Sequence, residues 1–154
     1  MAARNGRIAS RTSMLWVIGC VATLATAGLI RILATNLRPD RQLHDTYFVV
    51  VHSQAMLGWP ILFGFFAAWY YWFPKLTGYA YSDLLGRTHF WLLAIGVTIM
   101  VVPQIFLFAR MADAADVLRY GNWAAQIGSY ISAASILVFF VNVVLSLVRR
   151  RPAD

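Results

Sequence analysis

The chain has 154 residues, of which 60% are apolar and 12% are charged, and its formal net charge is +7. This composition favours the lipid bilayer over water as the solvent and argues against an ordinary soluble domain. In a membrane protein, an excess of positive charge usually sets the orientation of the chain in the membrane and attracts anionic lipids. We therefore expect no nucleic-acid partner.

Four apolar segments follow one another along the chain, near residues 14–33, 47–73, 90–108 and 123–148. Each is close to or above the ~20 residues that a helix needs to cross ~30 Å of hydrocarbon. Short polar connections separate them, and no linker or short repeat divides the chain. The sequence therefore predicts an all-α membrane protein in which residues 1–154 form a single domain of four transmembrane helices.

The positive residues are distributed unequally between the two sides that four crossings create. Eight lie in the two terminal tails and the second connection, and five lie on the opposite side. Because cytoplasmic segments carry the excess of Lys and Arg, we expect both termini to be cytoplasmic. The expected location is the bacterial inner (cytoplasmic) membrane, which the chain crosses several times.

The acidic and aromatic residues narrow the function classes. The chain contains no glutamate, and its six aspartates lie outside the apolar segments. A carboxylate within the membrane is a usual component of a proton relay, so a pump or antiporter is disfavoured. Aromatic residues at the segment ends, with the run 69–72 as the densest, fit an interfacial belt and need not mark a redox path.

Several sequence motifs occur in order along the chain. They are L-H-D-T-Y-F-V-V-V-H (43–52), W-F-P-K-L-T-G (72–78), G-R-T-H-F-W (86–91), P-Q-I-F-L (103–107) and I-G-S-Y-I-S (127–132). Together they resemble subunit I of haem–copper oxidases of the cytochrome c oxidase type, and the resemblance covers nearly the whole chain. It implies a truncated, free-standing homologue of the last four of that family's twelve helices.

His52 matches the family histidine that binds the iron of the oxygen-reducing haem. Two positions further on, where the family has the histidine of the low-spin haem, the chain has Gln54. An amide is a poor ligand of haem iron, so we expect no bis-histidine haem on that face. Three interpretations of His52 stay open: a core histidine bonded to a neighbouring helix, an axial ligand of a haem shared with another chain, or a ligand of some other cofactor.

The other two histidines and a nearby aspartate have weaker assignments. His44 and Asp45 match family residues near the haem propionates and the non-redox metal, so the resemblance makes them candidate cofactor-binding residues. Asp45 also has a local interpretation, because an aspartate there can cap the second helix. His89 matches a family position that we interpret as structural, and we expect it to form a hydrogen bond at a helix interface.

Two further departures from the family bear on activity. Where the family has an arginine pair that holds haem propionates, this chain has acids, Asp113 and Asp116. The family's copper-ligating histidines lie on helices that the resemblance does not include. We therefore expect no oxygen reduction by this chain alone, assign no catalytic or metal-ligating residue, and assign no cofactor, with haem kept as a candidate.

The favoured hypothesis is a non-catalytic subunit with a structural or assembly role in a larger respiratory or photosynthetic electron-transfer complex. Its partners are then other membrane subunits and lipids. One alternative is a haem-binding electron-transfer subunit with His52 as axial ligand. The other is one part of a split haem–copper oxidase catalytic subunit.

Overall fold

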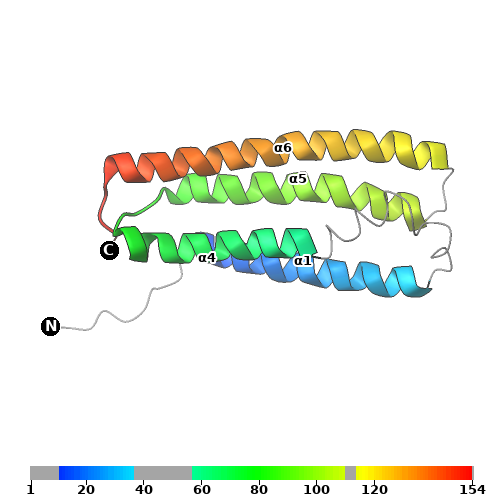
Figure 1. The fold of residues 1–154 in the computed structure, drawn as a ribbon, viewed down its shortest axis with the longest axis horizontal. Coiled ribbons are helices and arrows are strands. Elements are labelled where there is room, and N and C mark those ends of the chain that lie inside the picture. The colour runs from blue at the N-terminus through cyan, green and yellow to red at the C-terminus, as the bar shows by residue number, and fades with distance from the viewer. Residues whose placement is uncertain (1–10, 37–56, 110–113, 154) are drawn as a thin grey trace.

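The computed structural model describes residues 11–36, 57–109 and 114–153, and four helices account for most of them (Figure 1). They are α1 (Arg11–Asn36), α4 (Trp59–Thr77), α5 (Asp83–Ala109) and α6 (Ala114–Arg149). These ranges contain no strand, although an isolated antiparallel bridge joins Tyr79 to Pro152. The predicted all-α class is confirmed.

Three of the helices, α1, α5 and α6, extend at both ends beyond the apolar segments from which they were predicted. The largest difference is in α6, which begins at Ala114 instead of near residue 123 and has 36 residues. At 1.5 Å per residue it is about 54 Å long, well above the thickness of the hydrocarbon. High hydropathy identifies only the part of a helix that crosses lipid. The backbone hydrogen bonds of the helix continue beyond that part, where the side chains are polar.

Three of the helices are long and apolar enough to cross a membrane, over Arg11–Leu29, Asp83–Pro103 and Arg119–Arg149. These helices confirm a multi-pass membrane protein. The fourth helix, α4, has 19 described residues and is not among these three spans. The predicted second segment starts near residue 47, so its first part lies outside the described residues. A fourth crossing and the cytoplasmic orientation of the termini stay predictions.

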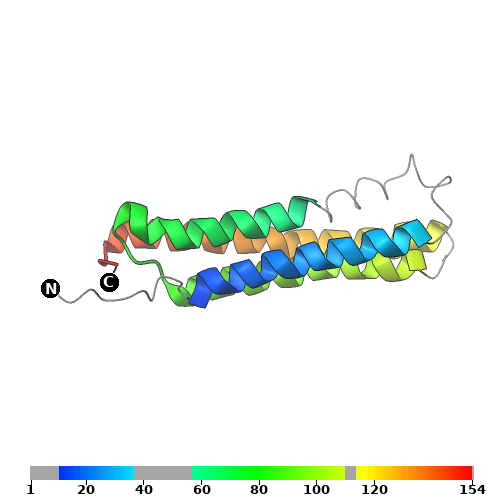
Figure 2. The same cartoon turned by 90° about the horizontal axis from the view of Figure 1, so that it is seen from below.

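The helices form an elongated bundle in which α1 lies along α4 and α5 lies along α6 (Figures 1 and 2). A contact between α1 and α5 joins the two pairs. The start of α1, the start of α5 and the end of α6 lie at the same end of the bundle (Figure 1). We call this end, which contains Thr12, Ser82, Asp83 and Asn142, the polar end.

The close approach of α5 to α6 depends on two glycines. A Cβ atom on Gly96 would lie 2.8 Å from the carbonyl oxygen of Gly128 and would also collide with Oγ of Ser132. A Cβ atom on Gly128 would lie 2.5 Å from the carbonyl oxygen of Gly96. Small residues let the backbones of membrane helices approach closely. A larger side chain at either position would push α5 and α6 apart.

Candidate functional site

The three candidate cofactor-binding residues from the sequence, His52, His44 and Asp45, lie outside the described residues, and so does Gln54. Their roles stay predictions. The described ranges do contain His89, the third histidine of the chain.

A tyrosine from α4 and a histidine from α5 meet inside the bundle. On α4, the buried residues Phe63, Phe66, Tyr70 and Phe73 are spaced by three or four positions and so share one helix face. His89, near the start of α5, is 0% exposed. The hydroxyl oxygen of Tyr70 lies 3.0 Å from Nδ1 of His89, within hydrogen-bond distance. The expected interface hydrogen bond of His89 is confirmed.

Each of the other three helices also places an aromatic ring against His89. The ring centroids of Trp16 (α1), Phe66 (α4) and Phe139 (α6) lie 4.6, 4.5 and 5.3 Å from that of His89. We call these rings, together with Tyr70 and His89, the His89 cluster. Aromatic pairs contribute roughly 0.5–1.5 kcal/mol each beyond the area that they bury. The cluster therefore ties all four described helices together at one point.

Two nitrogen atoms of the His89 cluster have no hydrogen-bond partner among the described residues, Nε2 of His89 and Nε1 of Trp16. When Tyr70 donates its hydroxyl proton to Nδ1, the neutral imidazole carries its own proton on Nε2. An N–H group against an aromatic face forms a weak hydrogen bond, which reduces the cost of burying it. This environment suits a neutral histidine that holds helices together.

Hydrogen bonds from two other helices hold the start of α5 at the polar end. The side chain of Asn142 accepts from the backbone N–H of Ser82 at 3.0 Å and donates to its carbonyl oxygen at 3.3 Å. The carboxylate of Asp83 accepts from Thr12 at 2.8 Å and from Arg87 at 2.9 Å. As a result, α6 and α1 are both fastened to the residues that begin α5.

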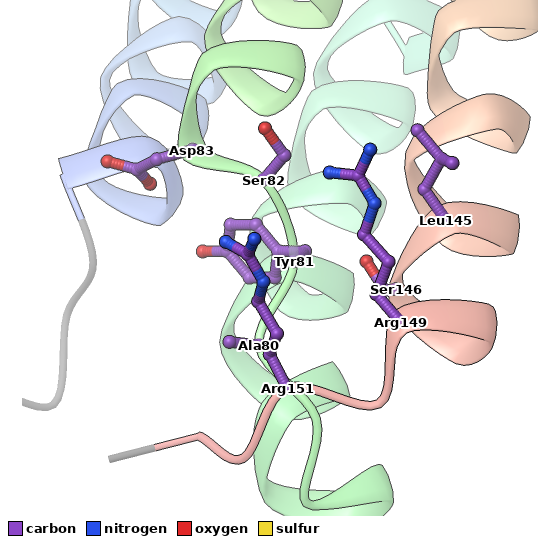
Figure 3. Close-up of a pocket in the computed structure, with 8 residues that line it drawn as sticks. All are labelled: Ala80, Tyr81, Ser82, Asp83, Leu145, Ser146, Arg149 and Arg151. Atoms are coloured by element: carbon purple, nitrogen blue, oxygen red, sulfur yellow. The ribbon is translucent and has the colours of Figure 1, made fainter.

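A pocket of about 280 Å³ lies beside these hydrogen bonds (Figure 3). Residues around the start of α5 and the end of α6 line it, with Ser82, Asp83, Arg149 and Arg151 among them. The two arginine side chains extend from α6 and the tail that follows it toward the start of α5 (Figure 3). This pocket combines positive charge with hydroxyl groups.

The sequence analysis did not identify Tyr70 or Asn142 as important. The interfacial-belt interpretation of the run 69–72 is wrong for Tyr70, which is 2% exposed, whereas Trp72 is 52% exposed. An interfacial belt is predicted from the position of a residue along the helix, and this position does not show whether the residue faces lipid or another helix. Asn142, only 1% exposed, carries a signal of its own, because a lone amide in an apolar run must find partners in the membrane.

Residues 1–130 of the chain match the family model described as Cytochrome C and Quinol oxidase polypeptide I. The chain belongs to this family. Cytochrome c oxidase subunit 1 of Cereibacter sphaeroides is 32% identical over 151 residues, which cover 95% of this chain and 26% of that protein. Its namesake in Debaryomyces hansenii is 33% identical over 148 residues, which cover 93% of this chain and 28% of that protein.

The comparisons confirm the resemblance to subunit I of the cytochrome c oxidase type. They also show that the chain spans only about a quarter of the length of the curated polypeptide I relatives that it matches. The chain is therefore a partial homologue.

The polypeptide I family implies haem, and the described residues can be compared with what a haem requires. His89 has Nδ1 bonded to Tyr70, and the rings of Trp16, Phe66 and Phe139 enclose its imidazole. A flat macrocycle could reach Nε2 only if these rings moved away. No group of three His, Cys, Asp or Glu side chains suited to a metal ion occurs in the described ranges. His89 is therefore not available as a haem ligand in this arrangement, and His52 lies outside the described residues.

Proposed function

We propose that the chain is a non-catalytic member of the polypeptide I family that contributes a helical layer to a larger electron-transfer complex in the membrane. Its role is structural: it presents a stable helix bundle against which other membrane subunits assemble. The observation that carries this proposal is the closed His89 cluster. The cluster joins the four described helices through the buried pair of Tyr70 and His89, and its rings enclose the imidazole.

The sequence supports the non-catalytic part of the proposal. Gln54 stands where the family has the ligand of the low-spin haem, and Asp113 and Asp116 stand where it has the propionate-binding arginines. By the resemblance, the copper-binding histidines belong to helices outside the region that this chain matches. Electron input and oxygen binding would therefore have to come from residues outside this sequence.

The surface and the relatives support the assembly part of the proposal. Between 22% and 33% of each candidate span is buried within the described bundle, so wide apolar faces stay uncovered. Lipid alone can cover such faces, and they do not by themselves demand a protein partner. The reason to propose one is that both relatives are named as subunits of an oxidase. We also propose four crossings, because of the four apolar segments, and cytoplasmic termini, because of the charge distribution. The bacterial inner membrane is the proposed location, because one of the two relatives is bacterial.

Purification from native membranes tests this function. A tagged copy of the chain, extracted in a mild detergent, should be recovered with other membrane subunits in fixed proportion. The chain purified alone should show no oxygen uptake above a detergent blank when reduced cytochrome c is the donor. Migration as a lone monomer with no partner recovered, or measurable oxygen uptake by the isolated chain, would contradict the proposal.

A haem-binding function is the second candidate, and one observation favours it: His52 occupies the position of a family haem ligand. In this alternative, His52 is an axial ligand either in an electron carrier or in one part of a split catalytic subunit. The visible absorption spectrum of the purified chain separates the two functions, because a histidine-ligated haem has a Soret band and a purely structural subunit has none. Activity that appears only when one specific partner is added would indicate the split enzyme.

A further inference from the structure

We propose that the pocket at the polar end binds the phosphate group of an anionic lipid headgroup through Arg149 and Arg151. Both arginines line the pocket, and their side chains extend toward the start of α5 (Figure 3). The proposal does not involve the candidate cofactor residues, and it does not depend on the proposed function.

The pocket carries an excess of positive charge. Within the described residues, neither Arg149 nor Arg151 forms an ion pair with a carboxylate. The acidic residue that lines the pocket, Asp83, has both carboxylate oxygens engaged: Oδ1 accepts from Thr12 at 2.8 Å and Oδ2 pairs with Arg87 at 2.9 Å. Because Arg87 balances the charge of Asp83, the charges of the two pocket arginines stay available for an anion.

The backbone holds Arg151 in place without using its side chain. The chain leaves α6 at Arg150, whose φ of 43° is uncommon for a residue other than glycine. The tail that follows lies against the connection between α4 and α5. The Ala80 N–H then donates to the carbonyl oxygen of Arg151 at 2.8 Å, and the Ala153 N–H donates to that of Gly78 at 2.9 Å. The guanidinium group is thus brought to the pocket in advance, which lowers the entropy cost of binding.

The start of α5 adds further groups that favour an anion. Ser82 Oγ accepts from the backbone N–H of Leu85 at 3.5 Å and keeps its own hydroxyl proton for an acceptor in the pocket. The N-terminal end of α5, a helix of 27 residues, also directs the positive end of its dipole toward this region. Guanidinium groups in particular match phosphate oxygens in geometry and charge.

The level of the pocket relative to the membrane favours a lipid headgroup over a free anion as the ligand. One candidate span, Asp83–Pro103, begins at the pocket and another, Arg119–Arg149, ends there. The pocket therefore lies where the hydrocarbon gives way to the headgroup layer. Basic pockets between transmembrane helices at this level are suited to anionic headgroups.

Lipid titration of the purified full chain in detergent micelles tests the site. Native mass spectrometry would measure binding of dioctanoyl phosphatidylglycerol, with dioctanoyl phosphatidylcholine as the zwitterionic comparison. We expect Arg149→Gln and Arg151→Gln each to weaken phosphatidylglycerol binding about tenfold, because each removes a charge-assisted contact to phosphate. The control Lys75→Gln removes an equal charge from the last turn of α4, at the same end of the bundle, but Lys75 does not line the pocket, so binding should stay close to wild type. Thermal unfolding would verify that all variants are folded.

Two results would overturn the assignment. If Lys75→Gln weakens binding as much as Arg149→Gln and Arg151→Gln do, the effect is one of general surface charge. If phosphatidylcholine binds as tightly as phosphatidylglycerol, the acyl chains and not the anionic headgroup determine binding. Inorganic phosphate, titrated alone, should bind far more weakly than phosphatidylglycerol. Equal affinity for inorganic phosphate would make the ligand a free anion and contradict a lipid site.

Discussion

Tyr70 of α4 and His89 of α5 are joined near the polar end of the bundle by a contact of 3.0 Å between the tyrosine hydroxyl and Nδ1. Trp16 and Phe139 of the remaining two helices pack against the same imidazole. Apolar helix faces in lipid can slide and rotate against one another at little cost, because lipid tails are as apolar as the side chains. A buried polar pair removes that freedom, and we infer that it fixes the rotational positions of α4 and α5.

Replacing Tyr70 with Phe removes the hydroxyl group and keeps the ring. We expect the free energy of unfolding in detergent micelles to fall by about 1 kcal/mol, the usual value of one interhelical hydrogen bond. The control is Tyr130→Phe, which removes a hydroxyl from a side chain that is 73% exposed and should leave stability unchanged. Equal stability of the two variants would show that the Tyr70–His89 bond does not stabilise the bundle.

Hydropathy was sufficient to predict the four helices of the described residues and their order, because a long apolar run marks each of them. It could not predict where α6 begins, since the residues after Ala114 are polar enough to lie outside lipid and are helical all the same. The structural role of His89 followed from the family resemblance. Its partner Tyr70 could not be predicted from hydropathy, because the partner of a buried group depends on which faces of two separate helices meet.

Substitution at Gly96 tests the packing of α5 against α6. We expect Gly96→Ala to lower the free energy of unfolding by about 1–3 kcal/mol, because the added methyl group has no space beside Gly128 and Ser132. Gly28→Ala is the matched control, since a Cβ atom there meets nothing within 4 Å. Denaturant unfolding of the two variants gives the comparison, and an unchanged Gly96→Ala would contradict the close approach of the two helices.

Cysteine labelling tests the predicted orientation. In a chain in which Cys20 is replaced by Ala, a cysteine at Ala2 should react with a membrane-impermeant reagent only from the cytoplasmic side. A cysteine at Asp40, in the connection after the first crossing, should react only from the outer side. Reaction of the Ala2 position from the outer side alone would reverse the proposed topology.

A structural subunit supports a complex without holding its haem, and His52→Gln tests this role most directly. The measurement is the Soret absorbance of the complex purified from native membranes through a tag on this chain, with the wild type and the variant compared at equal content of partner subunits. If His52 is a core histidine, the variant should assemble with a stability loss of about 1 kcal/mol and leave the Soret absorbance per complex unchanged. Loss of Soret absorbance with the partner subunits still assembled would contradict the structural role and establish His52 as a haem ligand.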